Sequence, residues 1–132
     1  MKRMAWNLGL VLVVMGLLAG CTSAIYNVNN ATVAGPTGGT LTMPEIKKAI
    51  MTAGAGLGWN VKEESPGHLV GTLHLRTHTA VVDIPYSTET YNITYKSSSN
   101  LLYDPEDGTI HSNYNGWIEN LDKAIKNQLA AL

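Results

Sequence analysis

The sequence predicts an α+β fold, a two-layer sandwich in which an antiparallel four-stranded meander carries two helices on one face, in the order α-β-β-β-β-α. Alternating apolar and polar residues fill a run of short segments between residues 59 and 96, as expected of antiparallel strands with one buried face. A segment with apolar residues at helical spacing lies on each side of this run. Because neither apolar stripe has another partner, both helices are expected to pack side by side on the sheet.

The first helix is expected to begin near Thr42, so the folded domain is placed at residues 42–132. Thr42 and Glu45 have the three-residue spacing of a capping box, and Pro44 falls in the first turn, where its missing N–H is harmless. Glycines up to Gly58 end the helix, and a phosphate-binding glycine loop is disfavoured because such a loop follows a strand. The expected apolar stripe consists of Ile46, Ala49, Ile50, Ala53 and Leu57.

Four strands are expected at residues 59–63, 68–75, 78–84 and 89–96. Alternation places one set of side chains against the helices: Trp59, Val61, Leu69, Leu73, Leu75, Ala80, Val82, Ile84, Tyr91, Ile93 and Tyr95. The opposite, polar face carries Asn60, Lys62, Val70, Thr72, His74, Val81, Asp83, Asn92 and Thr94. The sheet is therefore expected to be covered on one side only.

A polar loop at 97–100, a brief fifth strand at 101–103 and a turn at 104–108 are expected next. The last helix should start near Ser112 or Asn113, with Ser112, Asn113 or Asn115 as its cap. Its expected apolar stripe consists of Trp117, Ile118, Leu121, Ala124, Ile125 and Leu129.

The beginning of the chain has the pattern of a secretion signal. Lys2 and Arg3 precede an apolar run at residues 8–19, whose 12 residues are too few to span a bilayer, for which about 20 are needed. The sequence Leu18-Ala19-Gly20-Cys21 then resembles the lipobox of bacterial lipoproteins, the substrates of the type II signal peptidase. The resemblance implies that residues 1–20 are a lipoprotein signal peptide and that Cys21 carries the lipid. The alternative is an ordinary thiol behind an ordinary signal peptide.

Residues 21–41 are expected to be the lipidated cysteine and a flexible tether, because they are rich in Thr, Asn, Ala and Gly. A short strand at 25–28 that pairs with the domain is the alternative. Thr22 follows the cysteine, and in lipoproteins of this kind an aspartate there commonly causes retention in the inner membrane. The resemblance therefore implies an outer-membrane protein facing the periplasm, or alternatively the cell surface.

The folded part also resembles small Gram-negative lipoproteins without a settled activity, over about residues 43–130. The similarity rests on Gly58-Trp59, on residues 78–82, and on residues 110–115 before Trp117. It implies the fold and the location, and it implies no reaction.

Composition excludes some functions. Without Lys2 and Arg3, seven basic residues remain against ten acidic ones, a net charge of −3, so no nucleic-acid partner is expected.

No cofactor and no metal is expected. His74 and His78 straddle a hairpin, yet alternation puts them on opposite faces. The turn at 104–108 fails the EF-hand spacing, because its fifth position is glycine.

The polar sheet face is the candidate binding surface, with Thr72, His74, Arg76, Val81, Thr94 and Lys96 as its residues. A plain solvated face is the alternative.

The partners expected are the membrane, through the lipid on Cys21, and an envelope protein or glycan. The predicted function is a non-enzymatic binding or accessory module in the periplasm. A small envelope hydrolase is one alternative, although no Gly-x-Ser-x-Gly sequence accompanies the serines at 97–99. A lipoprotein displayed on the surface for adhesion or immune contact is another.

Overall fold

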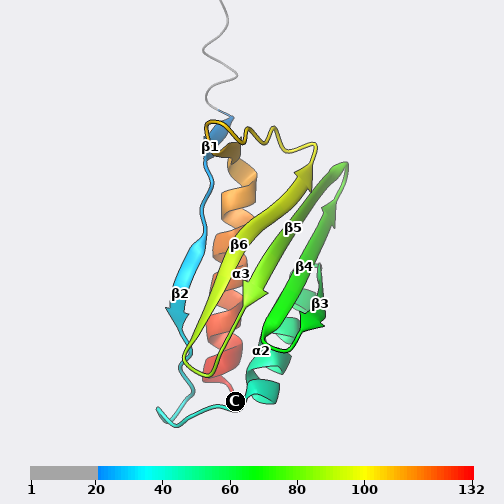
Figure 1. Cartoon of the computed structure of the whole chain (residues 1–132). Helices are drawn as coiled ribbons and strands as arrows, with labels where there is room; N and C mark the ends of the chain where they lie inside the picture. Colours follow the sequence, from blue (N-terminus) through cyan, green and yellow to red (C-terminus); the bar gives the residue numbers. More distant parts are fainter. Residues whose placement is uncertain (1–20) are drawn as a thin grey trace, which may run out of the picture.

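The computed structural model describes residues 21–132, and the expected signal peptide lies outside them. In chain order the elements are β1 (Thr22–Ala24), β2 (Val28–Thr32), α2 (Met43–Gly56), β3 (Trp59–Ser65), β4 (His68–Leu75), β5 (His78–Pro85), β6 (Thr90–Ser99), β7 (Thr109–His111) and α3 (Ser112–Ala130). Five strands form an antiparallel sheet in the order β2-β6-β5-β4-β3, and β1 pairs with β7. Both helices lie behind one face of the five-stranded sheet (Figure 1), which confirms the two-layer α+β sandwich.

Helix α2 begins where the sequence indicated. The Thr42 hydroxyl accepts from the Glu45 N–H at 3.3 Å, and the Glu45 carboxylate accepts from the Thr42 N–H at 3.4 Å, so the capping box is present. The expected stripe is buried as far as Ala53, but Leu57 lies beyond the end of the helix and is exposed. The helix approaches β3 so closely that a Cβ on Gly54 would stand 2.5 Å from a methyl carbon of Val61.

The meander β3 to β6 has the predicted alternation, and most of the expected buried face is buried. Two members differ from the prediction. Leu75 is 43% exposed, because it is the last residue of β4 before the two-residue turn to β5. Tyr95 is half-buried and packs its ring against Tyr103 and Tyr114.

The segment expected to be a flexible tether contributes two strands instead, and of the alternative strand at 25–28 only Val28 belongs to one of them. Val28 is buried, and β2 pairs with β6 as the fifth strand, with a register irregularity between Val28 and Ala31. Side-chain amides bridge this irregularity: Asn27 Oδ1 accepts from the Tyr95 N–H at 3.0 Å, and Asn92 Oδ1 accepts from the Asn30 N–H at 2.8 Å. An asparagine-rich segment that looked too polar to pack thus uses its amides to join the sheet.

Around β7 the prediction was wrong in detail. Residues 97–99 belong to β6, and the short strand is Thr109–His111 rather than 101–103. The turn before β7 is present, because Asp104 Oδ1 accepts from the backbone N–H groups of Glu106 and Asp107 at 2.9 and 3.3 Å.

Helix α3 starts at Ser112, but its cap is His111, whose Nδ1 accepts from the Asn113 N–H at 3.1 Å. Trp117 and Ala124 were expected in the buried stripe and are only half-buried. The buried stripe consists of Tyr114, Ile118, Leu121, Asp122, Ile125 and Leu129. The helix is therefore rotated toward Tyr114 and Asp122, so that Trp117 lies at the margin of the core.

Candidate functional site

The uncovered face of the five-stranded sheet is the candidate site, and antiparallel register arranges it in rows. Asn60, Thr72, Val81 and Ser97 are successive register partners across four strands. The next row consists of Lys62, Val70, Asp83 and Thr94. Thr72, Val81 and Thr94, three of the predicted site residues, are partly buried members of these rows. Alternation in the sequence therefore assigned these three residues to the same face of the sheet, as the register shows.

A charged cluster on this face centres on Asp83. His68 Nε2 lies 2.7 Å from Asp83 Oδ1, and Lys96 Nζ lies 3.5 Å from the same oxygen. Both contacts are partly screened by solvent, so each stabilises the fold only weakly. Both contacts are made to the same carboxylate oxygen, and the neighbouring row presents the hydroxyl and amide groups of Asn60, Thr72 and Ser97.

Lys96 reaches Asp83 because of a register shift. The sheet pairs Val82 with Tyr95 and Val81 with Ser97, which leaves Lys96 as the extra residue of a β-bulge. A bulge re-aims the side chains of the strand that carries it. Sequence reasoning grouped Asp83 and Lys96 with the polar face, but it predicted neither their contact nor that of His68 with Asp83, and it did not predict the bulge.

The two remaining predicted residues lie toward one end of this face. His74 is exposed, and its Nδ1 lies 3.1 Å from Thr79 Oγ1, its register neighbour. Arg76 is in the turn between β4 and β5, with a φ of 56°, and has no register partner in the sheet. The structure therefore separates Arg76 from the surface formed by Thr72, Val81 and Thr94.

The outer face is hollowed on the β3 side. A depression of about 300 Å³ is lined by Asn60, Lys62 and Glu64 from β3 and by Val70, Thr72 and His74 from β4. Apart from Val70, the lining consists of side chains with hydrogen-bond donors and acceptors, which suits a polar partner held against the sheet. Asn60, Lys62 and Val70 were assigned to this face from the alternation, whereas Glu64 was missed because β3 runs two residues further than expected.

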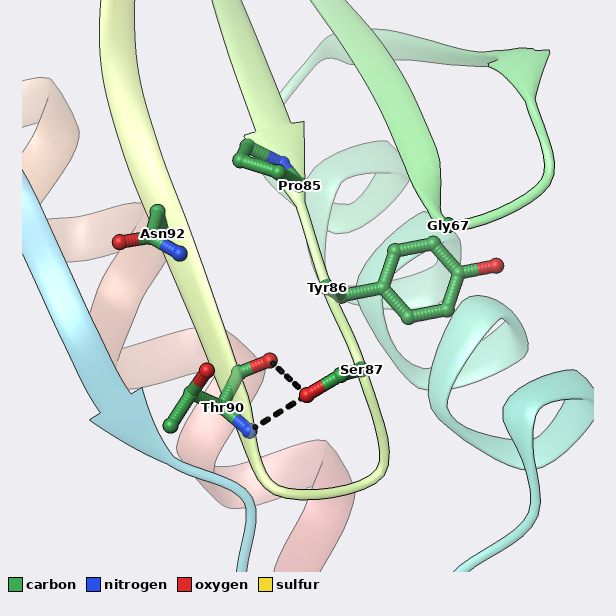
Figure 2. A pocket seen from close by; sticks show the side chains of 6 residues that line it. All are labelled: Gly67, Pro85, Tyr86, Ser87, Thr90 and Asn92. Carbon is green, nitrogen blue, oxygen red and sulfur yellow. Dashed lines mark hydrogen bonds between the residues drawn. The ribbon is translucent and has the colours of Figure 1, made fainter.

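A second pocket, of about 220 Å³, lies at the turn between β5 and β6. Figure 2 shows its lining of Gly67, Pro85, Tyr86, Ser87, Thr90 and Asn92. The Ser87 hydroxyl accepts from the Thr90 N–H at 3.1 Å and donates to the Thr90 carbonyl at 3.4 Å, so it is engaged in holding the turn. The lining offers one titratable group, Tyr86, whereas acid–base catalysis with paired groups needs two.

Within the described residues, side chains considered for catalysis or metal binding make local contacts. The Ser98 hydroxyl lies 2.8 Å from that of Tyr95, and Asp104 serves its own turn. His78 Nδ1 lies 2.6 Å from the Asn100 carbonyl oxygen, away from His74 on the outer face. Within residues 21–132, no group of three or more His, Cys, Asp or Glu side chains is arranged to hold a metal ion.

Comparisons with models of known protein families, with curated proteins and with solved structures give no match for this chain. Neither helix in the described part of the chain is long and apolar enough to cross a bilayer.

Proposed function

We propose that this chain is a lipid-anchored cell-envelope protein whose domain is a non-enzymatic binding or accessory module. The observation that carries the binding role is the uncovered sheet face, where Val70 and Val81 are flanked by Thr72 and Thr94. Helices cover only the other face of the sheet (Figure 1). A largely polar surface with two valines, hydroxyl groups in neighbouring rows and a shallow hollow supports recognition of a polar envelope partner, a protein or a glycan.

The proposed anchor is a lipid on Cys21. The lipobox-like sequence supports it, although Leu18, Ala19 and Gly20 lie outside the described residues. Cys21 is exposed and directly precedes β1. Two or more acyl chains on one residue hold a protein stably on a bilayer, since each buried methylene contributes about 0.8 kcal/mol. We place the protein in the outer membrane, facing the periplasm.

The anchor is tested by the Cys21→Ser variant. Radiolabelled palmitate should enter the wild-type protein and the Thr22→Ser control, and it should be absent from Cys21→Ser, which should accumulate as the uncut precursor. Palmitate in Cys21→Ser would show that the lipid is attached elsewhere.

The binding face is tested by photo-crosslinking in cells. Probes belong at Thr72 and Thr94 on the outer face, with Lys123 as the control, since Lys123 is exposed on α3 in the opposite layer. A discrete adduct from both sheet positions, absent from Lys123, is expected. Equal labelling at all three positions, or no adduct at Thr72 and Thr94, would contradict the binding face.

A further inference from the structure

The residue at the proposed anchor is fixed directly to the domain, without a spacer. The Cys21 carbonyl accepts hydrogen bonds from the Ser112 N–H at 3.0 Å and from the Ser112 hydroxyl at 3.2 Å. The next residue, Thr22, pairs with His111 in the short β1–β7 sheet. Cys21 is therefore held at the start of α3, at one end of the sandwich (Figure 1).

The same end of the domain is formed by the β4–β5 turn and by the loop between β6 and β7, both of which lie at the top of Figure 1. Hydrogen bonds join these parts. The Asn100 amide donates to Thr77 Oγ1 at 2.7 Å, and the Leu101 carbonyl accepts from the His111 N–H at 2.8 Å. The β4–β5 turn, the loop and the Cys21 attachment point thus form one continuous surface.

This end exposes large apolar side chains. Leu102, in the loop, is 58% exposed, more than any other large apolar residue of the described chain, and Leu75 beside the turn is 43% exposed. Leu102 has a φ of 56°, a left-handed conformation that a leucine adopts only at an energetic cost. Residues held in such conformations cluster at functional positions. The loop thus exposes an apolar side chain at the expense of backbone strain.

We propose that this end of the domain, with Leu102 and Leu75 as its contacts, lies against the lipid bilayer and inserts into its interface. The proposal rests on the lipid anchor at Cys21 proposed above. A lipid on Cys21 holds this end at the membrane surface, because β1 allows no separation between the anchor and the domain. Exposed leucines then enter the acyl boundary, and Arg76 at the tip of the turn is placed to meet lipid phosphates.

The same loop also carries the acidic residues Asp104, Glu106 and Asp107. The acidic turn at 104–108 is hydrogen-bonded to the residue that follows β1, since the Ile25 N–H donates to the Gly108 carbonyl at 3.0 Å. Ile25 is the fourth residue after Cys21 along the extended chain, a distance of about 13 Å. The Gly108 end of the acidic turn is therefore set back from Cys21, while its other end continues into the part of the loop that carries Leu102. The outer sheet face then stands beside the membrane and remains open to a partner.

The test places a fluorophore on a single introduced cysteine in the full lipidated protein, whose Cys21 thiol is already acylated. The positions are Leu102→Cys and Leu75→Cys, with Thr88→Cys as the control, because Thr88 is exposed in the β5–β6 turn at the opposite end (Figure 1). Each protein is reconstituted into vesicles of phosphatidylethanolamine and phosphatidylglycerol, with and without lipids carrying a quencher on their acyl chains. Vesicle flotation is measured in parallel.

Flotation of all three proteins is expected, with quenching at positions 102 and 75 at least twofold stronger than at 88. Equal quenching at 102, 75 and 88 in floating protein would overturn the bilayer contact and leave the anchor intact. A blue-shifted emission at 102 without lipid quenching would also overturn it, since a second copy of the chain would then cover the residue. Protein that fails to float would overturn the anchor and this contact together.

Discussion

Tyr91 donates a hydrogen bond from its hydroxyl to Oδ1 of Asp122, joining β6 to α3 inside the core. The other oxygen of this carboxylate accepts from Lys126 Nζ at 2.9 Å, one helical turn further along. Asp122 is only 8% exposed, and it is the one buried charged residue in the described part of the chain. A buried carboxylate with both oxygens bonded fixes the rotation of α3 on the sheet, because turning the helix would leave it unpaired.

Tyr91→Phe should destabilise the domain by about 1–3 kcal/mol, because Asp122 then loses a partner in a desolvated position. Urea denaturation measures this as a lower midpoint with an unchanged slope. Lys126→Met is the matched control. Its side chain is 58% exposed, so removing the ammonium should cost less than about 1 kcal/mol. Equal losses of unfolding free energy in both variants would show that the buried Tyr91 hydroxyl stabilises the domain no more than the exposed Lys126 ammonium does.

Tyr114→Phe should be neutral or stabilising. The Tyr114 hydroxyl is buried and has no hydrogen-bond partner among residues 21–132, so it is desolvated without compensation. Phenylalanine keeps the ring and its edge contact with Tyr95, whose centroid lies 5.8 Å away. Thermal unfolding of the two variants tests this. Tyr91→Phe should lower the Tm of the domain, whereas Tyr114→Phe, the same chemical change, should leave the Tm unchanged or raise it. A clear loss at 114 would mean that the hydroxyl has a partner, such as a bound water.

Alkaline pH should destabilise the domain through Tyr91 and Tyr114. Burial raises the pKa of both hydroxyls, and the hydrogen bond to Asp122 raises that of Tyr91 further. In the unfolded chain both tyrosine hydroxyls ionise at about pH 10. The folded state then binds more protons than the unfolded state, so stability is retained below about pH 10 and falls as the pH rises above it. The double variant Tyr91→Phe/Tyr114→Phe should show a flatter decline of unfolding free energy above about pH 10, whereas Tyr103→Phe, at an exposed position, should follow the wild type.

Gly54→Ala should destabilise the domain although alanine is the better helix former. The added Cβ would meet Val61 at 2.5 Å, so α2 or β3 must shift, at a cost of about 1–3 kcal/mol. Gly56→Ala is the matched control, since nothing lies within 4 Å of its Cβ position, and it should gain up to about 1 kcal/mol. Equilibrium denaturation of both variants measures the two changes in unfolding free energy. If Gly54→Ala were as stable as Gly56→Ala, the close approach of helix and strand would be disproved.

Trp117→Ala should cost about 1–3 kcal/mol, less than the loss of a fully buried tryptophan. Trp117 is half-buried beside the His78 ring, with centroids 6.4 Å apart, and it lines a small pocket with Trp59 and Leu73. Ile118→Ala is the comparison, because Ile118 is fully buried in the same turn of α3, and it should cost more. The reverse order, measured by denaturation, would place Trp117 in the core after all.

Local patterns predicted most of the sheet and α2. The capping residues Thr42 and Glu45 marked the helix start, and period-two alternation assigned nearly every side chain of the meander to its face. These signals are short in range, so they can be seen in the sequence. The rotation of α3 on the sheet could not be predicted from the sequence in the same way. An aspartate such as Asp122 is expected at the surface unless its buried partner, Tyr91, is known.

Long-range pairing was the main omission. A short strand at 25–28 was only the alternative to a tether, and the strand that forms, Val28–Thr32, depends on hydrogen bonds with β6 and on the amides of Asn27 and Asn92. The candidate site shows the same division. Alternation placed Thr72, Val81 and Thr94 on one face, whereas the contact of Lys96 with Asp83, next to a β-bulge, was seen only in the three-dimensional register.

The pairing of β1 with β7 and of β2 with β6 has a consequence for how the protein is made. Asn27 finds its partner Tyr95 68 residues later, and Ser23 meets Asn115 after 92. Contacts so distant in sequence form slowly, because a long loop must close first. A chain that emerges amino end first therefore cannot complete its sheet edge until nearly all of it has appeared. If the anchor is attached during export, the membrane holds an unfinished chain, and the last helix completes the domain beside the bilayer.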